Sequence, residues 1–202
     1  MLLKAVLILA IIIGTFWFLN QPKQAQFVSP SIQKSASVYT DPELKFKLEY
    51  PADFEVISES EEQYSERTKT QYRKNFKYYV TYEPPKFVKG IVVKPKETPL
   101  TADQFQSVPF MLWIFENPEG LDAQNWYKDF WYYPFFWGVY DGRKAQIEPA
   151  LEATISGIMA KSAEVSYSPG KPKLILLPKG EKMYLFKVME GGEKILNSFK
   201  FL

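Results

Sequence analysis

Cysteine and histidine are both absent from this chain of 202 residues. Without cysteine there is no disulfide, no thiolate nucleophile, no thiolate ligand for zinc or an iron–sulfur cluster, and no lipid-bearing N-terminal cysteine. Without histidine there is no usual general base of serine and cysteine hydrolases, and the commonest transition-metal ligand is missing. Chemistry carried by carboxylates, lysine, tyrosine or Ser–Lys pairs remains open, but no residue pattern in the chain indicates it.

A large net charge is missing as well. The chain has 25 basic and 23 acidic residues, a net charge of +2. No strong field of one sign would therefore draw it to nucleic acid, and we predict no nucleic-acid partner. The loop 117–120 lacks the alternating oxygen donors of a calcium loop, so we predict no metal site and no cofactor.

One long apolar run is present, at the very start of the sequence. Residues 1–19 contain a single charge, Lys4, and the next charge is Lys23. A helix over this run would rise roughly 27 Å, close to the ~30 Å thickness of a bilayer core, with Trp17 near the headgroups. We predict an uncleaved transmembrane signal anchor. A cleaved signal peptide is the alternative, but small residues at a cleavage site are missing after the run.

The rest of the chain is predicted to be a tether followed by one domain. Residues 20–37 are rich in glutamine, serine and proline, which is typical of a solvated linker. Residues 38–202 are long enough for one hydrophobic core. We expect a single-pass protein of the cell membrane whose C-terminal domain lies outside the cytoplasm, with the membrane as a partner through the N-terminal helix.

Short alternating segments dominate this domain. Phe46, Leu48 and Tyr50 share one face, and the continuous apolar run in 109–116 is typical of a central strand. Asp122 is a candidate cap for a helix that ends before Pro134. Strands are predicted at 46–50, 54–56, 76–82, 87–93, 109–116, 144–148, 152–160, 163–167, 173–177 and 182–189, with a second helix at 193–198. The predicted fold class is α+β, an antiparallel sheet flanked by helices.

The two ends of the domain resemble the PsbP-like family, in its membrane-anchored bacterial form. The opening run has Tyr and Asp before an aromatic strand that ends in Tyr-Pro and a further aromatic residue, and the closing run is a short helix followed by Ser-Phe-Lys-Phe. The matching residues are Tyr39, Asp41, Phe46, Tyr50, Pro51, Phe54, Ile195, Leu196, Ser198, Phe199 and Phe201. The resemblance implies an α/β/α sandwich used mainly as a non-enzymatic assembly domain outside the membrane.

Residues 126–140 are unusually aromatic, with ten aromatic side chains among fifteen. A helix buries one stripe, so several of these rings should stay exposed. Packing on the sheet is one interpretation, and a protein-interaction surface is another, since aromatic anchors dominate binding hot spots. Carbohydrate stacking and contact with the membrane surface are the remaining two. The candidate interaction surface consists of Trp126, Tyr127, Trp131, Tyr132, Tyr133, Phe136 and Trp137.

The function that follows is binding or assembly in the cell envelope, without catalysis, with an envelope protein as the partner. The alternative is a glycan-binding module or a carboxylate-based enzyme acting on glycans, because aromatic rings stack on sugars. Its acidic groups would come from Glu116, Glu119, Asp122 and Asp129. A Ser–Lys nucleophile around 156–162 is a further, minor alternative.

Overall fold

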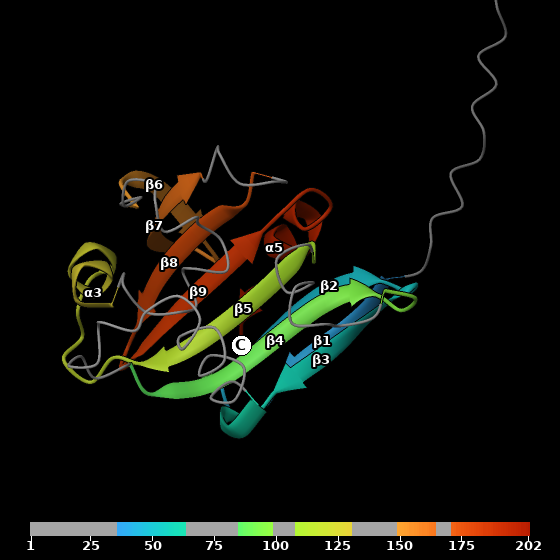
Figure 1. Cartoon of the computed structure of the whole chain (residues 1–202), viewed down its shortest axis with the longest axis horizontal. Helices are drawn as coiled ribbons and strands as arrows, with labels where there is room; N and C mark the ends of the chain where they lie inside the picture. Colours follow the sequence, from blue (N-terminus) through green and yellow to red (C-terminus); the bar gives the residue numbers. More distant parts are fainter. Residues whose placement is uncertain (1–35, 64–84, 99–107, 131–148, 165–170) are drawn as a thin grey trace, which may run out of the picture. The chain divides into compact units, whose positions relative to one another are not determined.

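The computed structural model describes residues 36–63, 85–98, 108–130, 149–164 and 171–202 (Figure 1). All of them belong to one folded unit, 34–202. The predicted anchor and nearly all of the predicted tether lie outside the described residues. Within the part of the chain that is described, no helix is both long enough and apolar enough to span a bilayer.

Seven antiparallel strands form the larger of two sheets. In spatial order they are β3 (Phe54–Glu59), β4 (Phe87–Pro95), β5 (Phe110–Glu116), β9 (Lys182–Val188), β8 (Lys173–Lys179), β7 (Ile158–Glu164) and β6 (Leu151–Ile155). The apolar run that was predicted to be central is β5, which pairs with β4 on one side and β9 on the other.

The two faces of this large sheet carry two separate hydrophobic clusters. Alternation along β5 shows the division: Phe110, Leu112 and Ile114 belong to one cluster, and the residues between them belong to the other. Successive side chains of a strand point to opposite faces, so a strand that is apolar throughout feeds both clusters. We call these surfaces the small-sheet face and the helix face, after the elements that cover them.

A second sheet of three strands covers the small-sheet face. It contains β1 (Ala36–Asp41), β2 (Phe46–Pro51) and β10 (Lys200–Phe201), with β2 in the middle. Helix α5 (Glu193–Ser198) leads into β10 and is fastened to β2, because the Glu49 amide donates to Ser198 Oγ at 2.8 Å. The two ends of the domain therefore form one layer, which packs on the middle of the chain.

Phenylalanine rings join this layer to the large sheet. The ring of Phe199 lies 5.1 Å from that of Phe46 in β2, 5.0 Å from that of Phe186 in β9 and 5.0 Å from that of Phe201 in β10, measured between centroids. Three of the aromatic residues that carry the resemblance, Phe46, Phe199 and Phe201, thus take part in the contact between the two sheets.

Helix α3 (Ala123–Phe130) lies on the helix face and packs against β7 and β8. Trp126 is buried against Phe115 of β5, with 5.5 Å between ring centroids. Asp122 caps the helix as predicted, since its Oδ1 accepts the Asn125 amide at 2.8 Å. The antiparallel α+β class is confirmed.

The predicted strand 152–160 is wrong in one respect. It is two strands, β6 and β7, joined at Ser156 and Gly157, where φ is 51° and 76°. Two residues with positive φ make the type I′ turn that favours a tight hairpin. The start of the predicted strand 163–167 is the end of β7, and β1 was not predicted because its edge position shows little apolar alternation. The predicted strands 76–82 and 144–148 lie outside the described residues.

Strand β4 contains a bulge near its start. The register slips between Phe87, opposite Phe115, and Lys89, opposite Ile114. Phe87 therefore belongs to the helix face, although residues 89, 91 and 93 point to the small-sheet face. The extra residue sets Phe87 on the opposite face from Lys89, which points toward the layer formed by the two ends of the domain.

Candidate functional site

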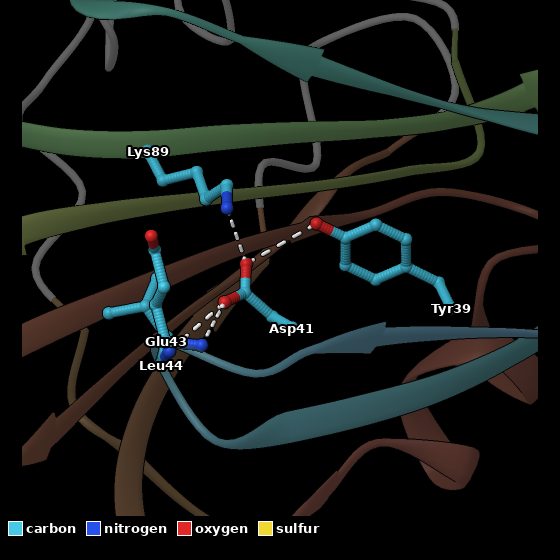
Figure 2. A network of polar contacts seen from close by, with 5 residues as sticks. All are labelled: Tyr39, Asp41, Glu43, Leu44 and Lys89. Atoms are coloured by element: carbon cyan, nitrogen blue, oxygen red, sulfur yellow. Dashed lines mark hydrogen bonds and ion pairs between the residues drawn. The ribbon is translucent and has the colours of Figure 1, made fainter.

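A densely bonded polar group surrounds the carboxylate of Asp41, at the end of β1. Figure 2 shows its surroundings. Lys89 Nζ lies 2.6 Å from Oδ2, and the Tyr39 hydroxyl donates to the same oxygen at 3.3 Å. The amides of Glu43 and Leu44 donate to Oδ1 at 3.2 and 3.0 Å. We call this group the Asp41 latch, because it ties the β1–β2 hairpin to β4.

The charges of the latch stabilise each other. Burial alone would raise the pKa of Asp41, but the Leu44 amide and the Lys89 ammonium outweigh it and lower that pKa. Burial alone would lower the pKa of Lys89, and its bond to Asp41 with the nearby negative charge raises it instead. Burial, together with the Asp41 charge, raises the pKa of Tyr39 and of Tyr184. At neutral pH the latch is an ion pair beside two uncharged phenols.

This arrangement fits a structural role for Asp41. Its side chain is fully buried, and each of its two oxygens accepts two contacts from the protein. A general base must reach a substrate proton, and a carboxylate enclosed in this way does not. Sequence reasoning missed the role of Asp41. The only local signal was the Asp-Pro pair before a turn, and its partner Lys89 is 48 residues away.

The structure corrects part of the predicted aromatic surface. Trp126 and Tyr127 are buried in the cluster on the helix face, so the prediction of exposed rings is wrong for these two residues. Their positions on the inner side of α3 follow from its contact with the large sheet. Trp131, Tyr132, Tyr133, Phe136 and Trp137 lie outside the described residues, and for them the prediction stands as a prediction.

Two of the four candidate carboxylates near this segment have structural partners. Glu116 Oε2 lies 2.6 Å from Lys182 Nζ across the β5–β9 pair, and Asp122 caps α3. Glu119 and Asp129 are exposed. Among the residues that the structure describes, no group of three or more acidic side chains is placed to hold a metal ion.

The Ser–Lys alternative is not supported at Lys161 and Ser162. They are neighbours in β7, so their side chains point to opposite faces. Lys161 Nζ pairs with Glu152 at 3.3 Å, and Ser162 Oγ donates to the Leu151 carbonyl at 3.4 Å. Ser156, in the turn, accepts the Phe201 amide at 3.1 Å.

Sequence reasoning also missed three charged residues buried on the helix face: Lys94, Lys187 and Glu59. Lys94 forms an ion pair with Glu55 on β3, directly opposite it in the register. Lys187 stands in β9 opposite Met111, between two apolar residues. A lysine inside an otherwise apolar strand is the sequence signal that indicates such a buried charge, because charged groups are buried only together with polar partners.

No protein-family model matches the chain, and no curated protein does. Several solved structures are similar to it, among them the following two. The solution structure of cyanobacterial PsbP from Synechocystis sp. PCC 6803 has 13% identity and a TM-score of 0.43, over 84% of this chain and 94% of that one. A crystal structure from Bacteroides thetaiotaomicron VPI-5482 has 10% identity and a TM-score of 0.41, over 82% of this chain.

The chain spans about half the length of the Bacteroides protein, 48% of which is covered. Both TM-scores are too low for either likeness to decide the family or the activity of the chain.

Proposed function

We propose that this chain is a membrane-anchored, extracytoplasmic domain of PsbP-like type that acts by binding another protein of the cell envelope. The observation that carries the proposal is the order of segments: an apolar run at 1–19, a polar stretch at 20–37 and a folded unit at 34–202. An anchor of this kind holds a domain at a membrane surface and confines its encounters to that surface.

Binding is favoured over catalysis by what the polar groups in the described residues do. The Asp41 latch joins two sheets, Asp122 caps a helix, and Glu116 pairs with Lys182 across neighbouring strands. Each of these contacts is structural. These three carboxylates are therefore engaged in holding the fold together rather than placed to transfer a proton to a substrate.

The binding surface that we propose begins where α3 ends. Trp126 and Tyr127 fix the helix on the large sheet, and the aromatic residues from Trp131 to Trp137 follow it directly in the sequence. Large aromatic side chains supply much of the binding energy of protein interfaces. Trp126 and Tyr127 thus fix the part of the chain that directly precedes the proposed binding surface.

The location can be tested with single cysteines, because the chain has none of its own. Ser37→Cys in the full chain should react with a membrane-impermeant maleimide added to intact cells, and the protein should stay in the membrane pellet after carbonate washing. Labelling only after the cells are opened, or release by carbonate, would contradict the proposed location.

The binding surface can be tested by crosslinking in cells. Trp131→Ala and Trp137→Ala should remove the crosslinked partner, while Lys128→Ala, on the exposed side of α3, should keep it. Unchanged partner recovery in both tryptophan variants would reject the surface. A change in tryptophan fluorescence on adding cell-wall fragments, lost in the same two variants, would favour the glycan-binding alternative.

A further inference from the structure

Strand β6 lies at one end of the large sheet, and in the described part of the chain its outer edge is unpaired. Leu151 is 58% exposed, the Glu152 side chain is 76% exposed, and Thr154 is exposed too. The strand at the opposite end of the sheet, β3, is mostly half-buried. The two edges of the same sheet are therefore not equivalent.

The tight turn determines which backbone groups face outward. In a two-residue hairpin the flanking residues, here Ile155 and Ile158, exchange hydrogen bonds, and hydrogen-bonded pairs then alternate along the ladder. Ala153 consequently faces β7 with its backbone, while the N–H and C=O groups of Glu152 and Thr154 point away from the sheet. Four backbone groups thus stand along this edge.

Among the described residues, β6 carries none of the usual sequence protections of an edge strand. β6 has the sequence LEATI, with no proline, no lysine and no bulge. Its one charge, Glu152, is already neutralised by Lys161 of β7. An edge of this kind is a template for another extended segment.

We propose that β6 pairs antiparallel with β6 of a second copy of this chain, with Glu152 opposite Thr154 of the partner copy and Ala153 opposite its own equivalent. This register lets the outward groups of both strands form four hydrogen bonds. It places Leu151 opposite Ile155 on the small-sheet face, and it keeps the two Glu152 side chains out of register. A shift by two residues would set those carboxylates directly opposite each other, which is unfavourable.

The symmetry of this pairing suits two anchored molecules. An antiparallel pair at a sheet edge has its two-fold axis perpendicular to the sheet, so both small-sheet faces lie on the same side of the joined sheet. β1, which follows the tether, belongs to the layer on that face. Strand β1 of both copies would then lie on one side of the joined sheet, which suits two domains anchored in one membrane. The anchoring of both copies in one membrane rests on the proposed function, whereas the pairing of the two β6 strands does not.

The absence of cysteine makes the register directly measurable. Ala153 and its equivalent would form a non-hydrogen-bonded pair with Cα atoms about 4.5 Å apart, within the range of a disulfide. Ala153→Cys in the full chain, in its own membrane, should form a disulfide-linked dimer under mild oxidation. Leu151→Cys is the control, because its equivalents would be four residues out of register, about 13 Å apart. We expect at least tenfold less dimer from the control.

Charge substitutions at residue 154 test the same register while the crosslinking cysteine stays at position 153. In the Ala153→Cys background, Thr154→Lys would place a lysine opposite Glu152 of the other copy at two equivalent positions. Thr154→Glu would instead place a carboxylate opposite Glu152 at both positions. At low salt we expect about a tenfold lower dimer yield for the glutamate variant than for the lysine variant. Equal yields in these two variants, equal crosslinking at 151 and 153, or no dimer at all would overturn the proposal. None of these outcomes affects the labelling of Ser37→Cys, so the two proposals can fail separately.

Discussion

The two faces of the large sheet are closed in different ways. The small-sheet face is covered by both ends of the domain and fastened by a buried ion pair, Asp41 with Lys89. The helix face carries α3, from the middle of the chain, held by buried aromatic side chains and one capping carboxylate. The first face joins elements distant in sequence, so its loss should unfold the whole domain. The second relies on a local element, which can shift without the sheet separating.

The largest effect should come from Phe199→Ala. The ring is 2% exposed and meets rings from β2, β9 and β10, so its removal would leave a cavity between two sheets that cannot close easily. We expect a loss of about 4–5 kcal/mol in the free energy of unfolding, measured by urea denaturation. Leu202→Ala, which removes an exposed side chain close by, should change stability by less than about 0.5 kcal/mol.

Trp126→Ala should cost less than Phe199→Ala, at about 3 kcal/mol, although the side chain is larger. The reason is that Trp126 belongs to a local helix and packs on Phe130 of that helix as well as on Phe115 of β5, so α3 can move to fill part of the space. Amide hydrogen exchange should increase in α3 and remain slow in β5 and β9. If Trp126→Ala lowered the free energy of unfolding as much as Phe199→Ala does, with fast exchange in the whole sheet, the integrity of the domain would depend equally on both faces.

Asp41→Asn should remove an acid-sensitive part of the stability. The pKa of Asp41 is lowered on folding, so its contribution is complete above the unfolded value, about 3.9, and is lost as the pH falls through the lower folded value. The parent protein should therefore lose stability more steeply below about pH 4 than the variant does. At pH 7 the variant should be less stable by about 2 kcal/mol, because Lys89 loses its charged partner and reaches solvent only in part. Parallel curves of stability against pH for the two proteins would exclude the latch as the cause.

Asp122→Ala should have the smallest effect, about 1 kcal/mol, since it removes one capping bond at the exposed start of α3. Asp122→Asn keeps an acceptor and should recover most of this loss. Circular dichroism during thermal unfolding would measure both variants. A loss as large as that of Trp126→Ala would show that the cap, rather than the buried ring, holds the helix on the sheet.

The sequence predicted best where one residue pattern has one physical meaning. The apolar run that became β5, the cap at Asp122 and the helix after Gly191 and Gly192 each rest on local chemistry, and the structure has all three. The hairpin at Ser156 and Gly157 was read as a continuous strand, because apolar residues stand on both sides of a turn of only two residues.

Contacts between distant segments could not be predicted. The latch depends on Lys89 meeting Asp41, which is 48 residues away in the sequence, and the pattern of apolar residues carries no sign of such a pairing. The aromatic segment after α3 was ambiguous for another reason. Composition gives the number of rings, but which of them lie on the inner side depends on how the helix meets the sheet, and that contact buries Trp126 and Tyr127.

The bulge in β4 also predicts which changes this strand would tolerate. It is a phase shift: the residues before it are out of step with those after it by one position. Val88, the extra residue, is only half-buried, so other side chains should be accepted there. Deleting it should be accepted as well, because Phe87 and Lys89 would then be adjacent in a regular strand and would keep their opposite faces. At this position neither the length of the strand nor its composition is therefore under strict physical constraint.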